Sequence, residues 1–164
     1  MRKPRSEPLD FEALPGHYIR RLQQIAVAVF LQETEAHGLT PVQYAALNQV
    51  AKTPGIDQRT LARSIGQDTS TIAGVVDRLE ARGLMLRNAS PEDRRVRRLE
   101  PTADGHALLA AVAPDILKAQ ERMLHPLTKA ERAEFMRMLR VVVTANNDLS
   151  RAPSEDRGGA AKHR

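Results

Sequence analysis

Two short apolar segments, each ended by a glycine, constrain the fold of this chain more than any other feature of its sequence. Residues 57–66 begin with an aspartate and repeat apolar side chains at spacings of three or four. Residues 68–83 have the same organisation, with Asp68 or Thr69 as the cap. Aspartate and threonine cap helices, and glycine often follows the last helical residue. Two short helices joined by a tight glycine-containing turn are what a helix-turn-helix unit requires.

An arginine-rich turn follows these two helices. Residues 84–87 and 96–99 favour extended backbone, and they flank the turn-forming residues 88–95. Within residues 82–98, six arginines stand against two acids, whereas the net charge of the whole chain, +5, is shared by many soluble proteins and decides little. The segment predicts a β-hairpin wing with the charge that a nucleic-acid partner requires, and a solvated charged loop is the alternative.

Longer helical patterns flank this unit. Apolar residues recur at helical spacing within residues 14–30, and threonines that can cap helices stand at Thr40, Thr102 and Thr128. The chain is therefore predicted to be mainly α with a small β-hairpin, in a winged helix-turn-helix fold. The predicted organisation is a flexible tail at 1–12, dimerisation helices at 13–38 and 102–150, a winged helix-turn-helix DNA-binding domain at 39–101, and a disordered tail at 151–164.

The apolar stripes of the flanking helices favour a homodimer, because a winged helix is already a closed unit and these stripes need another partner. Two-fold symmetry would place two recognition helices one DNA turn apart, roughly 34–36 Å, and predicts a palindromic operator. The stoichiometry follows from this geometry and from no single motif.

The composition excludes several functional classes. The chain has no cysteine, so disulfides, thiol redox sensing and cysteine-ligated zinc are ruled out, and a reducing cytoplasm is the expected location. No segment resembles a secretion signal, a membrane span, a phosphate-binding glycine loop or a nucleophile elbow. We therefore expect no enzyme, no cofactor and no membrane partner. Five histidines lack partners at metal-ligand spacing, so no metal is expected, although a site assembled across a dimer stays open: His17, His37, His106, His125 and His163.

The second helix of the unit opens with small hydroxyl residues at 69–71. Their oxygens can bond to phosphates or base edges in a major groove, and simple helix capping is the alternative. At the hairpin tip, Arg94 and Arg95 can enter the minor groove, while Asp93 can hold an arginine in place. The predicted contacts with double-stranded DNA are Arg63, Gln67, Thr69, Ser70, Thr71, Arg78, Arg87, Asp93, Arg94, Arg95 and Arg97.

Four segments resemble the MarR (multiple antibiotic resistance regulator) family in order and spacing: residues 39–47, 60–66, 76–84 and 90–95. The resemblance extends over about 13–150 with the flanking helices. It implies a triangular homodimer that blocks, or less often aids, promoter access and is released by a small aromatic acid. Asp93-x-Arg95 matches the family wing motif, so the resemblance makes Arg95 the first candidate for the minor groove.

Two positions depart from the family pattern. Ala73 and Gly74 stand where members often carry polar or arginine residues, which predicts less base reading by side chains and more readout of DNA shape. Pro101 replaces a leucine before the threonine that opens the fifth helix, and it can alter how the wing joins that helix.

Residues 15–24 further resemble the branch of the family that represses nicotinic acid catabolism, which implies an effector such as 6-hydroxynicotinic acid. His17 and Arg21 lie one helical turn apart and can hold a carboxylate, while Tyr44 and Asn48 can face an aromatic ring. Alternatively, Tyr44 packs in the core and Arg20 or Arg21 pairs with an acid across the dimer. The predicted ligand-binding residues are His17, Tyr18, Arg20, Arg21, Tyr44 and Asn48.

Together these features predict a ligand-responsive transcriptional repressor that binds palindromic promoter DNA as a homodimer. Its partners would be double-stranded DNA, a second copy of itself and a small aromatic acid. The alternatives are a ligand-independent architectural or activating DNA-binding protein, and a winged helix that binds an acidic protein. Two properties of DNA binding separate these alternatives. Contacts with phosphates make binding depend on salt, and contacts with bases make it depend on the DNA sequence.

Overall fold

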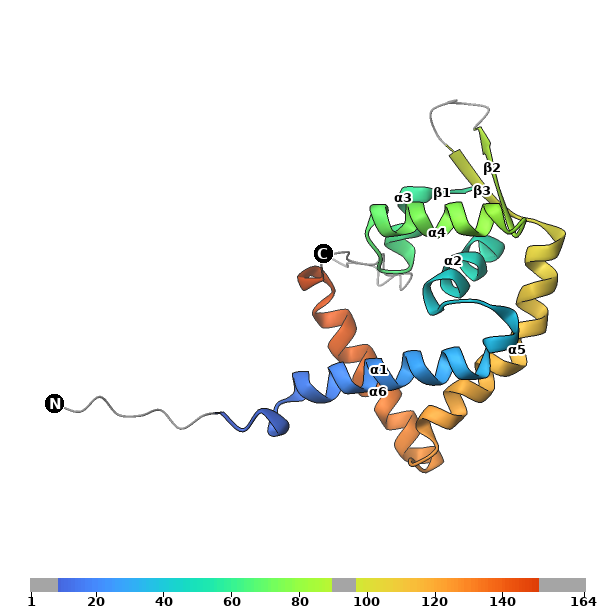
Figure 1. Cartoon of the computed structure of the whole chain (residues 1–164). Coiled ribbons are helices and arrows are strands. Elements are labelled where there is room, and N and C mark those ends of the chain that lie inside the picture. Colours follow the sequence, from blue (N-terminus) through green and yellow to red (C-terminus); the bar gives the residue numbers. More distant parts are fainter. Residues whose placement is uncertain (1–8, 90–96, 151–164) are drawn as a thin grey trace, which may run out of the picture.

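The computed structural model describes residues 9–89 and 97–150, and it is mainly helical with a small antiparallel sheet (Figure 1). This confirms the predicted fold class. No helix in these two ranges is long and apolar enough to cross a membrane. In chain order the helices and strands are α1 (Pro15–Glu33), α2 (Pro41–Lys52), β1 (Ile56–Asp57), α3 (Gln58–Ser64), α4 (Thr69–Ala81), β2 (Met85–Ala89), β3 (Arg97–Pro101), α5 (Ala103–Leu124) and α6 (Lys129–Ala145), with short 3-10 helices η1 (Phe11–Ala13), η2 (Glu35–His37) and η3 (Asn147–Leu149).

The helices begin where the sequence places caps. At Thr40 the side chain accepts from the Gln43 amide at 3.2 Å, and the Gln43 side chain accepts from the Thr40 amide at 3.0 Å. A second capping box joins Thr128 and Glu131 at the start of α6. Asp68, and not Thr69, caps α4. Such caps contribute about 1 kcal/mol each and fix where a helix starts.

The sheet has three strands in the order β1-β3-β2. The predicted hairpin is confirmed, with Arg87 opposite Leu99. Its strands differ in their bounds, because Asn88 and Ala89, predicted to lie in the turn, pair with Arg98 and Arg97 as part of β2. The two-residue strand β1 was not predicted, because two residues are too short to show alternation. Its residue Ile56 pairs with Leu99 and ties the start of α3 to the hairpin.

A continuous core lies inside the lobe made by α2, α3, α4 and the sheet. Its side chains come from every one of these elements, and Val112 of α5 joins them. Gly105 brings α5 against the lobe: a Cβ at this position would lie 2.2 Å from the backbone oxygen of Leu84, so only glycine permits the approach. The fully buried side chains in the lobe include Leu39, Leu47, Val50, Leu61, Ile72, Val76, Leu79, Met85 and Leu99.

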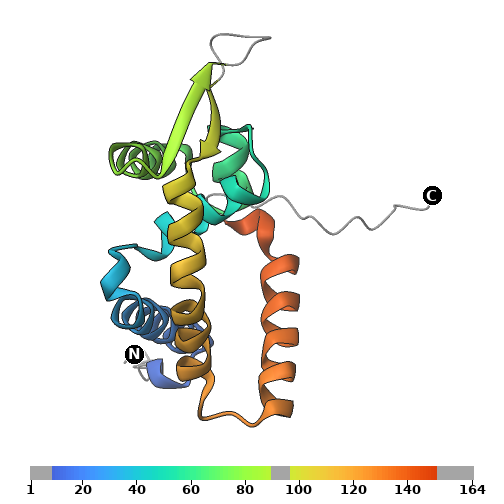
Figure 2. The same ribbon diagram turned by 90° about the vertical axis from the view of Figure 1, so that its right-hand side faces the viewer.

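The long helices form the rest of the protomer. Helix α1 packs along α5, and Glu33 bridges the two by ion pairs with Lys118 at 2.6 Å and Arg122 at 2.7 Å. Hydrogen bonds from these two cations hold the pKa of Glu33 below its ordinary value. Helix α6 turns back antiparallel to α5 but stands apart from it (Figure 2) and has no buried residue.

A short turn joins the long helices to the lobe. Gly38 adopts a left-handed conformation there, with φ of 59°. Arg82 at the end of α4 donates to the backbone oxygens of Gly38 at 2.7 Å and His37 at 3.1 Å. The His37 ring lies 2.8 Å from a carboxylate oxygen of Asp115 in α5. The end of α4, the second helix of the helix-turn-helix and the predicted recognition helix, is thus linked through this turn to α5.

Candidate DNA-binding surface and ligand site

The start of α4 is organised around the carboxylate of Asp68. One oxygen accepts from the Ser70 hydroxyl at 2.5 Å and the Thr71 amide at 2.8 Å, and the other accepts from the Thr71 hydroxyl at 2.6 Å. These hydrogen bonds hold the pKa of Asp68 well below its usual range, and the bond from Ser70 has the largest effect. All of these residues are exposed. The carboxylate therefore stays charged at the surface expected to face DNA.

This arrangement fixes the chemistry that the helix can offer. A carboxylate only accepts hydrogen bonds, so the Ser70 and Thr71 hydroxyls donate to it and present their lone pairs outward. The charge of Asp68 also disfavours a phosphate at the helix start. Acceptors of this kind suit the amino groups of cytosine or adenine in a major groove. The capping that the sequence offered as the alternative role of residues 69–71 is carried out by Asp68, which leaves the outward lone pairs of Ser70 and Thr71 available to DNA.

The other predicted DNA contacts are spread over the same lobe. Arg63 on α3 and Arg78 on α4 are exposed, and Gln67 in the turn between these helices is half-buried. The Arg78 guanidinium lies 3.3 Å from where a Cβ of Gly74 would stand, so the small residue leaves room for it along the helix. Asp93, Arg94 and Arg95 fall in 90–96, outside the described residues.

The arginines at the base of the hairpin are mostly bonded within the protein. Arg82 holds the turn at Gly38, and Arg98 donates to the Gly55 backbone oxygen at 3.4 Å. Arg87 pairs with two acids of α4, while Arg97 is exposed. In the sequence, all of these arginines count toward one basic segment. Counting charges cannot reveal that an arginine is paired within the protein, because each pairing joins residues from different elements.

The predicted ligand residues on α1 form an aromatic and cationic group. The His17 ring makes edge-on contacts with two other rings. The distance between ring centroids is 4.8 Å to Phe11 and 5.5 Å to Tyr18. The Nδ1 of His17 is buried and has no hydrogen-bond partner in the described part of the chain. Tyr18, Arg20 and Arg21 are exposed beside it.

The predicted ligand residues on α2 lie elsewhere. Tyr44 and Asn48 are half-buried, and the Tyr44 ring packs 6.1 Å from Phe30 at the edge of the lobe core. Phe30 follows His17 by thirteen residues on α1. At about 1.5 Å per residue this separation is roughly 20 Å. By the same rise Arg21 lies about 14 Å along the helix from Phe30, so His17 is the predicted residue most remote from Tyr44 within one protomer.

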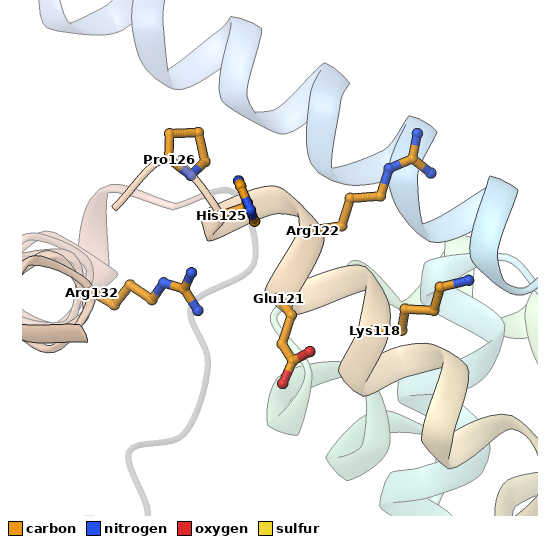
Figure 3. Close-up of a pocket in the computed structure, with 6 residues that line it drawn as sticks. All are labelled: Lys118, Glu121, Arg122, His125, Pro126 and Arg132. Carbon is orange, nitrogen blue, oxygen red and sulfur yellow. The ribbon is translucent and has the colours of Figure 1, made fainter. Parts of the chain in front are cut away.

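Two hollows lie apart from all of these residues. One, of about 690 Å³, is lined by residues of α5 and α6 at their connecting corner (Figure 3), with Lys118 and Arg122 directed toward α1. The other, of about 450 Å³, lies where α1 meets α2 and is lined by residues from Leu31 to Thr40. Among residues 9–89 and 97–150, no cluster of three or more histidine or acidic side chains could hold a metal ion.

Comparison with known proteins identifies this arrangement. Residues 39–96 match the MarR family. The chain is 32% identical to a putative transcriptional regulatory protein for the hcr operon of Thauera aromatica, over 85% of this chain and 91% of that protein. It belongs to the MarR family. A second MarR-family relative, the repressor NicR of Pseudomonas putida, is 30% identical over 86% of this chain and 89% of NicR.

Solved MarR-family structures agree with the fold. The regulator PcaV of Streptomyces coelicolor, solved with its natural ligand, has a TM-score of 0.76 and 35% identity, over 85% of this chain and 99% of PcaV. BpsR of Bordetella bronchiseptica, whose DNA binding is regulated by 6-hydroxynicotinic acid, has a TM-score of 0.78 and 29% identity, over 83% of this chain and 97% of BpsR. The chain is a winged-helix, DNA-binding transcriptional regulator and not an enzyme.

Proposed function

We propose that this MarR-family regulator is a homodimeric repressor that leaves promoter DNA when a small aromatic acid binds between its protomers. The observation that carries the proposal is the group of His17, Tyr18, Arg20 and Arg21 on α1. Tyr18, Arg20 and Arg21 are exposed, His17 is half-buried, and the buried Nδ1 of His17 has no partner in the described ranges. We place the protein in the cytoplasm, in keeping with its lack of cysteine.

The exposed apolar side chains of the long helices support a dimer. Val141, Val142 and Val143 of α6 are each more than half exposed, and so is Leu117 of α5. Large apolar side chains left exposed on these helices indicate an interface between proteins. A second copy would cover it and would bring another α1 to the molecule.

The chemistry of the α1 group suits an aromatic acid. A guanidinium holds a carboxylate by paired hydrogen bonds, and the imidazole of His17 can bond to a ring substituent or to the acid. The Tyr18 ring offers a stacking face. Tyr44 and Asn48 would come from the other protomer, because His17 of the same chain lies roughly 20 Å along α1 from Phe30, which packs against Tyr44. The regulation of BpsR by 6-hydroxynicotinic acid supports a hydroxynicotinate as the first effector to test, and the relative NicR, a transcriptional repressor, supports the repressor role.

Release from DNA would follow from a shift in population. A ligand that prefers a wider separation of the two lobes weakens DNA binding only by the difference in its affinity for the two states. The tight contact of α5 with the lobe at Gly105 would carry a movement of the long helices to α4. Wing residue Arg95 is proposed to enter the minor groove, so Arg95→Ala should weaken operator binding strongly and leave the dimer intact.

The test is fluorescence polarisation with DNA from the protein's own promoter region and a scrambled duplex, with and without nicotinic and 6-hydroxynicotinic acids. Specific binding that one acid relieves is the expected result. Specific binding that neither acid changes would reject these effectors and leave a regulator with another ligand or none. Equal binding to scrambled DNA would reject operator recognition and favour the architectural or protein-binding alternatives.

A further inference from the structure

We propose that Arg87 positions the wing against the recognition helix and does not contact DNA. Arg87 lies on β2, and its guanidinium pairs with two carboxylates of α4. Nη2 contacts Asp77, and Nε lies 2.9 Å from Glu80. The Arg87 side chain is 23% exposed, compared with 63% for Asp77 and 41% for Glu80. The arginine is thus the enclosed member of the group, and the acids face solvent.

The position of the ion pairs gives them a mechanical role. Strand β2 is an edge strand of the sheet, since the order β1-β3-β2 leaves it paired on one side only. Asp77 and Glu80 are three residues apart and lie on successive turns of α4. One planar guanidinium that holds both carboxylates therefore fixes the strand in orientation as well as in distance. The wing and the recognition helix would move as one body.

The charges argue against a phosphate contact by the same side chain. A guanidinium shared by two carboxylates sits in a group whose net charge is negative. Nη2 donates to Asp77, whereas Nε pairs with Glu80 by charge at 2.9 Å and has no hydrogen bond among the described residues. Binding to phosphate would require those ion pairs to break. Its contribution to binding would come through geometry and would add no phosphate contact.

The experiment compares Arg87→Ala, Arg87→Lys, Asp77→Asn and the double variant Arg87→Ala with Asp77→Asn in the full-length protein. The probe is the duplex that the wild-type protein enriches from a random-sequence library, titrated at several salt concentrations. Lysine keeps the charge but cannot hold two carboxylates in fixed geometry. Arg97→Ala is the matched control, because Arg97 is an exposed arginine on the neighbouring strand.

We expect each single variant to weaken binding roughly tenfold, within the usual range for coupled neighbours, and the double variant to be no weaker than the singles. The salt dependence should stay that of the wild type in all of them. If Arg87 instead contacted a phosphate, Arg87→Ala would lower the slope of log affinity against log salt by about one, as we expect for Arg97→Ala. Arg87→Lys would then keep the affinity of the wild type.

Asp77→Asn keeps the proposal testable if the Arg87 variants unfold, because Asp77 is largely exposed. Weaker binding with an unchanged melting temperature and faster amide exchange in β2 supports a positioning role. Unchanged or tighter binding by Asp77→Asn would overturn it, since an arginine released from an acid would then be free for DNA. The inference depends on DNA binding by the family and not on the proposed dimer or effector, so an effector that fails leaves it standing.

Discussion

The DNA-binding lobe and the long helices of this protein differ in how they bury apolar surface. In the lobe, Leu47, Leu61 and Leu79 are wholly buried within a single chain. Helix α6 has no buried residue, although its sequence is as amphipathic as a helix of a closed core. The lobe is therefore complete in one protomer, whereas the long helices would form half of the proposed dimer interface. Changes in the two regions should differ in their dependence on protein concentration.

The largest effect is expected for Leu79→Ala in the lobe core. Removing a fully buried leucine costs about 2–5 kcal/mol of the free energy of unfolding. Because the contacts lie within one chain, chemical denaturation should show this loss at every protein concentration. A loss that grows on dilution would mean that the lobe also depends on a second copy.

A charge on α6 should break the interface and spare the lobe. Val142→Glu places a carboxylate on the exposed apolar face, and burying an unpaired charge is strongly unfavourable. We expect a monomer by light scattering, with the helical content of the lobe retained. Arg140→Glu, also exposed on α6, is a control for a change of charge on this helix. If Val142→Glu stays dimeric, the interface lies elsewhere.

Gly105→Ala tests the joint between the two regions. The added Cβ would meet the Leu84 backbone oxygen, so α5 must shift from the lobe at a cost of roughly 1–3 kcal/mol. Thermal unfolding should show the loss, and the response of DNA binding to effector should weaken with it. Ala107→Gly, at an exposed site of α5, gives the effect of helix propensity alone. Equal melting temperatures for wild type and Gly105→Ala would contradict the tight joint.

The smallest effect concerns the link between α1 and α5. The pKa of Glu33 is lowered from its ordinary value near 4.5 by hydrogen bonds from Lys118 and Arg122. Its ion pairs therefore stabilise the fold fully above that ordinary value, and the contribution is lost as the pH falls through the lowered folded-state value. Glu33→Gln should melt slightly lower than wild type at neutral pH, with the difference vanishing in acid. A difference in melting temperature that grows in acid would contradict the stabilising role given to the charged form of Glu33.

Local signals explain why so much of the fold follows from the sequence. Threonine and aspartate caps, left-handed glycines and apolar spacing placed each α-helix, because these features act over a few residues. Strand β1 escaped prediction because it depends on pairing with a strand some forty residues later. The pairing of Arg87 with Asp77 escaped for the same reason, since it joins a helix to a strand.

The ligand site shows the limit of helical spacing. Spacing placed His17 beside Arg21 and Tyr44 beside Asn48, and each pair shares a helix face by geometry. It carries no information on the distance between the pairs; along α1 alone, His17 lies roughly 20 Å from Phe30, which packs against Tyr44. In the proposed dimer their meeting depends on a second chain, and the sequence of one chain describes that contact only through its exposed apolar side chains.

The most direct test of the account is complementation in a mixed dimer, because its central claim is that each effector site takes residues from two protomers. Arg21→Ala and Tyr44→Phe should each abolish effector binding in a homodimer. A co-expressed heterodimer with one variant in each protomer would rebuild one intact site. Calorimetric titration with the acid that releases the wild type should then give one bound ligand per heterodimer. A heterodimer that binds none would contradict the account and place the site within a single protomer.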